Sequence, residues 1–353
     1  MNERPLIIDL IRDSVRDDTE RRLKANTFNQ PAKPEPADDL FTIHTANRWM
    51  QLQSTEPDCK MLMGSFWHQQ ELCIMFADTN MGKSILAVQL AHELARGAAL
   101  EPFANHSEPA KVLYMDFELS PKQFQTRYHE GHATHNFADN LYRAEFNTQA
   151  QVPYQYKTLD EYMNAGIEYS IKRTGAQVLI IDNISCLRTS IIERGNEALA
   201  LMQHLKALKV KYKLSILVLA HTPKRNPANP ISRNDLQGSK MLINFADSAF
   251  AIGQSSTRPE VRYLKQVKQR SGTETYGADN ICLFTMQKQY GYLHFKFEGY
   301  AREADHLRRF SHQQRVDLAN KALQLQTDGL SQRQIAAKLK LSLSTVNKLL
   351  NWA

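Results

Sequence analysis

The sequence predicts an α/β fold in which helices flank a mostly parallel sheet, followed by a helical module at the C-terminus. Within residues 41–300, short apolar segments rich in β-branched residues alternate with helical patterns, as a helix-covered parallel sheet requires. One of these segments leads directly into a glycine-containing loop and a helix. Residues 301–353 show only helical periodicity and are basic. We therefore expect an α/β domain with a separate helical domain after it.

The first forty residues precede this pattern. Residues 1–26 resemble a short amphipathic helix, and residues 27–39 form a linker that contains Pro31, Pro34 and Pro36. The predicted organisation is therefore an N-terminal arm and linker over residues 1–40, an α/β domain over 41–300 and a helical domain over 301–353.

The sheet is expected to have a parallel part and an antiparallel extension. The predicted parallel strands are Leu72–Phe76, Val112–Phe117, Val178–Ile181, Ile216–Ala220 and Ser248–Ile252. The predicted antiparallel strands are Val261–Val267, Ile281–Met286 and Tyr292–Phe297, with a hairpin turn at Gln289–Gly291. Helices are predicted at Ser84–Arg96 and Asn196–Lys211.

Composition excludes several classes of protein. The chain is 42% hydrophobic and 23% charged, which is typical of a folded soluble protein. It has neither an apolar run of membrane-spanning length nor the pattern of a secretory signal, so we expect a cytoplasmic protein that does not bind membranes. The four cysteines form no CxxC pair, which argues against a zinc site. The net charge of +7 favours polyanionic partners.

The segment from Ala77 to Ser84 matches the phosphate-loop pattern G-x-x-x-x-G-K-[ST], except that alanine replaces the first glycine. Backbone N–H groups can surround a β-phosphate there, Lys83 can reach the β and γ oxygens, and the Ser84 hydroxyl can hold Mg²⁺. The predicted nucleotide-binding residues are Ala77, Asp78, Thr79, Asn80, Met81, Gly82, Lys83, Ser84, Ile85 and Asp182. The alternative is a chance Gly-Lys-Ser at a helix start.

Two acidic residues end predicted strands. Asp182 follows Val178–Ile181 and can hold Mg²⁺ beside Ser84. Asn183 comes next, so a base that activates water must lie elsewhere. Glu118 follows another strand, and ligands bind at the carboxyl ends of parallel strands. The alternative role for Glu118 is to cap the next helix.

The segment Asp116-Phe117-Glu118-Leu119-Ser120, taken with Lys83 and Asp182, resembles the RecA/DnaB-like P-loop ATPases, and especially the plasmid replicative helicase RepA. The resemblance spans roughly residues 61–297. It implies a RecA-like core that binds ATP and Mg²⁺, with Glu118 polarising the attacking water. It also implies assembly into a ring, for which we expect a hexamer, and binding to single-stranded DNA.

The same resemblance assigns three further residues near the phosphate chemistry. His221 ends the strand Ile216–Ala220 where the family has a sensor, although a lone histidine there is often structural. Lys268 and Arg270 resemble the Lys-x-Arg element that touches a neighbouring subunit's γ-phosphate. A period of two puts both on one strand face. The alternative interpretation is that both residues lie on a solvated, basic edge strand.

Candidate DNA contacts lie in two regions. The resemblance points to the loop after His221, where the candidates are Lys224, Arg225, Arg233 and Lys240, and to residues 185–196 with Arg188 and Arg194. In the C-terminal region two helical patterns resemble a helix-turn-helix. Its second helix offers Ser344, Thr345, Asn347 and Lys348 for possible contact with duplex DNA. The alternatives are that the loop is simply solvated and that the helices contact another protein.

The sequence therefore predicts an ATP-hydrolysing DNA-binding protein, either a RepA-like helicase or replication ATPase, or an ATP-gated DNA-binding regulator without translocation. His129, His132 and His135 recur every three residues, but no acid or cysteine completes a ligand set, so we do not predict a metal there.

Overall fold

The computed structural model describes residues 41–55, 57–147, 149–184, 195–223, 225–236, 240–308, 312–339 and 341–351, together with Arg16, Glu20 and Arg21. The predicted arm and linker lie outside these residues, apart from those last three. The chain divides into two compact units, residues 1–58 and 59–353. In the first unit, helix α2 (Ala46–Gln53) begins at Thr45, whose side chain accepts a hydrogen bond from the backbone N–H of Arg48.

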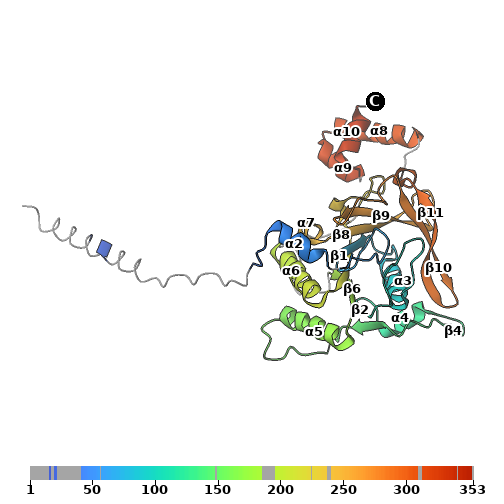
Figure 1. The fold of residues 1–353 in the computed structure, drawn as a ribbon. Coiled ribbons are helices and arrows are strands. Elements are labelled where there is room, and N and C mark those ends of the chain that lie inside the picture. Colours follow the sequence, from blue (N-terminus) through green and yellow to red (C-terminus); the bar gives the residue numbers. More distant parts are fainter. Residues whose placement is uncertain are drawn as a thin grey trace, which may run out of the picture. The chain divides into compact units, whose positions relative to one another are not determined.

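In the described part of the second unit, nine strands form one sheet in the order β11-β10-β9-β8-β1-β7-β6-β2-β5 (Figure 1). The parallel strands are β1 (Leu72–Ala77), β2 (Val112–Asp116), β5 (Leu141–Glu145), β6 (Val178–Asp182), β7 (Ser215–His221) and β8 (Ser248–Gln254). The antiparallel strands are β9 (Val261–Gln269), β10 (Ile281–Gln289) and β11 (Tyr292–Ala301). The predicted α/β fold with a mostly parallel sheet is confirmed, whereas β5 was not predicted.

Side chains of β1 alternate between two cores, as the period of a strand requires. Leu72, Ile74 and Phe76 pack in one apolar cluster with residues from three helices: α5 (Leu159–Thr174), α6 (Gly195–Tyr212) and α7 (Lys240–Phe245). The intervening residues of β1 pack in the other cluster with α3 (Lys83–Arg96). Figure 1 shows α5 and α6 on one side of the sheet and α3 on the other. Both faces of the sheet are therefore covered.

The predicted hairpin turn is confirmed. Strand β10 ends at Gln289 and β11 begins at Tyr292, so that the turn consists of Tyr290 (φ 50°) and Gly291 (φ 81°). Two consecutive positive φ angles match the right-handed twist of the strands that the turn joins. A short ribbon of β3 (His129–Glu130) and β4 (Ala133–Thr134) follows helix α4 (Pro121–Arg127) and was not predicted.

The segment after β11 packs against the same sheet. Glu303, which is 1% exposed, accepts hydrogen bonds from Lys265 of β9 (2.5 Å) and from the backbone N–H of Ile231 (2.7 Å). Residues 225–236 are thereby attached to both β9 and the segment that follows β11. Residues near 303 thus belong structurally with the sheet, although the helical pattern assigned them to the next domain.

Three helices follow: α8 (His312–Thr327), α9 (Gln332–Leu339) and α10 (Leu343–Leu350). Ala322 of α8, Ile335 of α9 and Val346 of α10 share a small apolar core. Ser342 caps α10 by accepting from the backbone N–H of Thr345 at 3.1 Å. The expected helical region is present, while its use as a DNA-binding helix-turn-helix stays a prediction.

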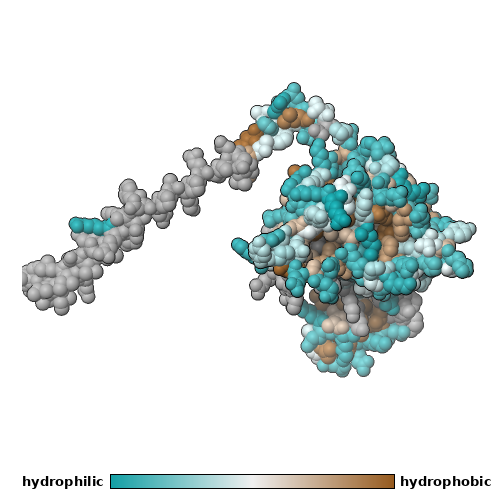
Figure 2. Space-filling model, turned by 90° about the horizontal axis from the view of Figure 1, so that it is seen from below, coloured by the Kyte–Doolittle hydropathy of each residue, from teal (hydrophilic) through white to brown (hydrophobic). Residues whose placement is uncertain are grey.

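Hydrophilic residues make up most of the face seen in Figure 2. Among the helices whose residues are described, we find none with both the length and the apolar character that a membrane span requires.

Candidate active site

The loop between β1 and α3 has the backbone that a phosphate site needs. Asn80 (φ 61°) and Gly82 (φ 91°) adopt left-handed conformations, and Ala77 does not. Alanine therefore fits where the motif usually has its first glycine. A Cβ on Gly82 would lie 2.8 Å from Met286 Sδ and from the Phe295 ring. Gly82 is thus required both by its φ angle and by close packing against β10 and β11.

A cavity of about 290 Å³ opens at this loop. Residues 79–85 line it together with Glu118, Arg127, His221 and Met286. It forms where parallel strands end, since Ala77 pairs with His221, and Asp116 at the end of β2 pairs with Asp182 at the end of β6. The topology thus brings the predicted nucleotide loop, Glu118 and His221 to one cavity, as expected for the carboxyl edge of such a sheet.

Lys83 is buried at the base of this cavity. Its ammonium donates to the backbone carbonyls of Ala77 and Asp78, each at 3.2 Å, and lies 3.1 Å from His221 Nδ1. Burial lowers the pKa of Lys83, although Glu118, Asp182 and Asp78 oppose the change. The lysine therefore contacts the phosphate loop itself, at the place from which it would reach phosphate oxygens.

Asp182 has the surroundings of a Mg²⁺ ligand. Its Oδ2 accepts from the Tyr114 hydroxyl at 2.6 Å, while its Oδ1 is buried and has no hydrogen-bond partner in the described part of the chain. Burial raises the pKa of Asp182 to about 6, and the nearby hydroxyls of Ser84 and Tyr114 oppose the rise. An unpaired carboxylate oxygen near a serine hydroxyl fits Mg²⁺, which prefers oxygen ligands.

The side chain of Glu118 contacts residues at the carboxyl ends of β6 and β7, the two strands that follow β2 on one side in the sheet. Asn183 Nδ2 donates to Glu118 Oε1, and His221 Nε2 lies 3.4 Å from the same oxygen. The contact with His221 lowers the pKa of Glu118, as does the one with Asn183, while burial opposes them. Ser120, rather than Glu118, caps α4. The helix-cap alternative for Glu118 is therefore wrong, and its role as a base stays a prediction.

His221 connects the lysine to the carboxylate. The Lys83 ammonium has only donors, so His221 Nδ1 can accept from it. The other ring nitrogen, Nε2, lies 3.4 Å from Glu118 Oε1 and 2.9 Å from Asn183 Nδ2. His221 thus contacts both Lys83 and the candidate base Glu118, and its role as a sensor stays a prediction.

Replacement of His221 by alanine is expected to move the acidic limb of the pH–turnover profile to higher pH. The folded-state pKa of Glu118 is lowered chiefly by His221, and only the carboxylate acts as a base, above its pKa. Removal of the histidine raises that pKa, so activity is lost sooner as the pH falls. The measurement is kcat/KM against pH at saturating Mg²⁺. If turnover falls but the acidic limb stays at the same pH, His221 does not control the pKa of Glu118.

The turn that carries Glu118 depends on an ion pair that the sequence did not reveal. Arg143 of β5 contacts Asp116 Oδ2 at 2.9 Å. The other carboxylate oxygen of Asp116 accepts from the backbone N–H groups of Glu118 (3.1 Å) and Leu119 (2.9 Å). Asp116 is 1% exposed, so breaking the pair would leave a buried charge without its partner. The only sequence signal for this ion pair was the alternation of charged and uncharged residues in the segment of β5.

Lys268 and Arg270 lie where the parallel strands begin, at the end of the sheet opposite to the carboxyl ends that form the nucleotide cavity. Lys268 donates to the Ile243 carbonyl at 2.6 Å, and Arg270 to the Asn244 carbonyl at 2.8 Å. Arg270 also pairs with Asp247 (3.2 Å), next to the residue that begins β8. The structure therefore does not bring them to the cavity of their own chain. Strand β9 lies between β8 and β10, so the edge-strand alternative is wrong.

The candidate DNA residues are only partly described. Arg225 donates to the Asn229 carbonyl, and Arg233 to the Val267 carbonyl at 2.6 Å. Lys240 is the first residue of α7. Lys224, Arg188 and Arg194 lie outside the described residues. In the last helix Ser344, Asn347 and Lys348 are exposed and Thr345 is half-buried. Arg225 lines a further cavity together with Asp78 and Met81 of the phosphate loop. The DNA role of all these side chains stays a prediction.

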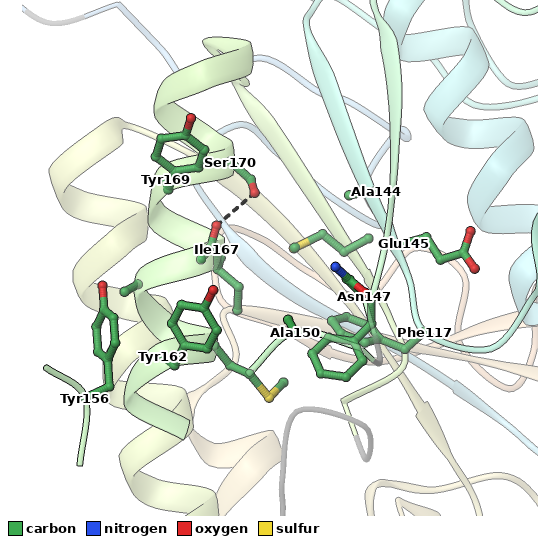
Figure 3. A pocket seen from close by; sticks show the side chains of 15 residues that line it. Phe117, Ala144, Glu145, Asn147, Ala150, Tyr156, Tyr162, Ile167, Tyr169 and Ser170 are labelled. Atoms are coloured by element: carbon green, nitrogen blue, oxygen red, sulfur yellow. Dashed lines mark hydrogen bonds between the residues drawn. The ribbon is translucent and has the colours of Figure 1, made fainter. Parts of the chain in front are cut away.

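A second cavity of about 400 Å³ lies near the end of β2 and α5. Figure 3 shows Tyr162 of α5 on one side and Phe117 and Asn147 on the other. Phe117 directly precedes Glu118, so this apolar cavity and the nucleotide cavity share one turn. In the described ranges no group of three or more His, Cys, Asp or Glu residues is arranged to hold a metal ion.

A family model described as an AAA domain matches residues 43–227, which is 185 of the 353 residues. That range contains Lys83, Glu118, Asp182 and His221. No curated protein sequence matches the chain. Among solved structures, a KaiC-like protein from the hyperthermophilic archaeon Pyrococcus horikoshii is 12% identical with a TM-score of 0.44, over 65% of this chain and 91% of that one.

Proposed function

Because the chain belongs to the AAA domain family of P-loop ATPases, we propose that it hydrolyses ATP at this cavity and couples the reaction to DNA, as a helicase or replication ATPase similar to RepA. The observation that carries the proposal is the chain of contacts from Lys83 through His221 to Glu118. It connects a cation suited to phosphate oxygens with a carboxylate suited to activating water.

Each residue has a defined part in this proposal. Lys83 neutralises charge on the β and γ oxygens, and the loop backbone surrounds the phosphates. Ser84 and Asp182 would hold Mg²⁺, which neutralises phosphate charge when bound. Glu118, kept ionised by its contacts with His221 and Asn183, takes a proton from the attacking water. The water oxygen bonds to the γ-phosphorus while the bond from that phosphorus to the β–γ bridging oxygen breaks, so that phosphate forms and ADP leaves.

The DNA and assembly parts of the proposal rest on other residues. The basic loop after His221 offers Arg225 and Arg233 to the backbone of a single strand. The position of Arg270 far from its own cavity favours action on a neighbouring copy in a homo-oligomeric ring, which we propose to be hexameric. Residues 302–353 carry nine Lys or Arg against four Asp or Glu, and this charge suits them to a nucleic-acid backbone.

The test measures ATP turnover with and without single-stranded DNA, and displacement of a labelled strand from a forked duplex. We expect single-stranded DNA to stimulate turnover and strand displacement to require both ATP and Mg²⁺. If ATP is hydrolysed but no strand is displaced under any fork geometry, the helicase proposal fails. The ATP-gated regulator, which the exposed polar face of α10 favours, then becomes the better proposal.

Deletion of residues 309–353 is expected to leave basal ATP turnover largely intact and to weaken duplex DNA binding by about tenfold or more at low salt. The deletion starts after residue 308 because the buried Glu303 must be kept. Fluorescence anisotropy at two salt concentrations measures the affinity. As a control, Lys348→Ala in the full chain should weaken binding without removing any helix. Unchanged DNA affinity together with lost turnover would assign the helices to packing or assembly.

A further inference from the structure

Tyr114 is a buried residue of β2 whose hydroxyl contacts the candidate Mg²⁺ ligand Asp182. It is 1% exposed. In the parallel pairing of β2 with β6, Tyr114 lies beside Ile180 and Asp116 lies beside Asp182. Residues two apart share one face of a strand, so Tyr114 and Asp182 are diagonal neighbours on the same face. The Tyr114 hydroxyl donates a hydrogen bond to Asp182 Oδ2 at 2.6 Å.

Packing holds the Tyr114 ring on the face of the sheet that α3 covers. Tyr114, Ile180 and Leu90 of α3 belong to one apolar cluster, and α3 begins with Lys83 and Ser84 of the phosphate loop. A buried tyrosine hydroxyl needs a hydrogen-bond partner, so the contact with Asp182 could serve the fold alone. The position of the hydroxyl beside the proposed metal site gives it a second use.

The two carboxylate oxygens of Asp182 have different surroundings. Oδ2 accepts from Tyr114, whereas Oδ1 is buried and has no hydrogen-bond partner within the described ranges. The last torsion of an aspartate side chain has a broad range of allowed angles, so a carboxylate without a fixed contact can turn. The Tyr114 hydroxyl limits that rotation, and it thereby determines which oxygen remains available.

Resting on the proposed ATP and Mg²⁺ site, we propose that Tyr114 is a positioning residue for the metal: its hydroxyl holds one oxygen of Asp182 so that the other is available to Mg²⁺. Removal of a group that orients a metal ligand commonly weakens metal binding by about 10- to 100-fold. Tyr114 is not among the residues that line the nucleotide cavity. Its effect on nucleotide binding should therefore depend on the metal.

The experiment compares Tyr114→Phe with the wild type, with Asp182→Asn and with Tyr292→Phe. Tyr114→Phe removes one hydroxyl and keeps the packed ring. Tyr292→Phe is the matched control, because it also removes a buried hydroxyl, one that has no hydrogen-bond partner among the described residues. Dissociation constants are measured for a non-hydrolysable ATP analogue, once in the presence of Mg²⁺ and once in EDTA.

We expect Tyr114→Phe to weaken the affinity measured in Mg²⁺ by about 10- to 100-fold and to leave the affinity measured in EDTA unchanged. Asp182→Asn should lose at least as much of the Mg²⁺-dependent affinity, and Tyr292→Phe should match the wild type in both solutions. The Mg²⁺ concentration for half-maximal ATP turnover should also rise in Tyr114→Phe. Excess Mg²⁺ should restore much of its turnover, because the metal ligand itself is still present.

Two results would overturn the inference. Equal affinities of Tyr114→Phe and the wild type in Mg²⁺ would show that the hydroxyl does not support the metal site. An equal loss in Mg²⁺ and in EDTA would assign Tyr114 to the fold alone. A different result would reject the proposed Mg²⁺ site itself: Mg²⁺ fails to tighten binding by the wild type, or Asp182→Asn responds to Mg²⁺ as the wild type does.

Discussion

Replacement of Glu118 by glutamine is expected to lower ATP turnover by a factor of about 10²–10⁴ while ATP affinity changes little. The two side chains have nearly the same shape, and a glutamine oxygen can still accept from Asn183 and His221. What is lost is a carboxylate able to take a proton from water. Single-turnover hydrolysis gives the rate of the chemical step, and equilibrium titration gives the affinity.

Asn183→Ala is the matched control for this substitution. It removes one donor to the Glu118 carboxylate but leaves the carboxylate and its contact with His221, so turnover should fall far less. If Asn183→Ala is the damaging change and Glu118→Gln is mild, the base lies elsewhere and the role of Glu118 must be abandoned.

Arg270→Ala is expected to lower the turnover of the assembled protein by a factor of about 10³, the scale known for arginines that act across subunits. Arg270 lies at the sheet edge opposite to the nucleotide cavity, so in isolated subunits the change should have no effect on hydrolysis. Turnover measured across a range of protein concentrations, with the assembly state followed by sizing, separates the two cases. Arg258→Ala, which removes an exposed arginine paired with Glu260 and Glu298, should behave as the wild type.

Mixing two inactive variants sharpens this test. Lys83→Ala lacks the lysine that we propose to bind phosphate but keeps Arg270, whereas Arg270→Ala has the reverse defect. In mixed assemblies some interfaces pair the intact lysine of one chain with the intact arginine of another, and activity should partly return. If the mixture stays inactive although subunits exchange, Arg270 has a local role, holding Asp247 and the Asn244 carbonyl.

The sequence predicted the parts of the fold that depend on local pattern. Apolar strands, the hairpin turn at Tyr290 and Gly291, and the phosphate loop were all predictable, because periodicity and turn chemistry act over a few residues. The grouping of Lys83, Glu118 and His221 was also predictable, since parallel strands share a carboxyl edge. Ala77 is tolerated because its position does not need a left-handed backbone.

Contacts that depend on tertiary placement were not predictable. The alternation of Arg143 and Glu145 with uncharged residues is compatible with a strand over the short segment of β5, but nothing local pairs Arg143 with Asp116. Arg127 lies in a short helix of mostly polar residues, and nothing local marks it as facing a cavity. The period of two related Lys268 to Arg270, but it could not tell to which edge of the sheet they belong.

The separation of Arg270 from the cavity of its own chain makes the subunit a directional unit. Under the proposed action across subunits, one surface supplies the arginine and a different surface receives it, so the contact is heterologous. An open row of such subunits would have unlike ends, one with an unused cavity and the other with an unused arginine. Every subunit has a complete site only when the row closes into a ring. Loss of a single subunit would therefore also leave a neighbouring cavity without its arginine.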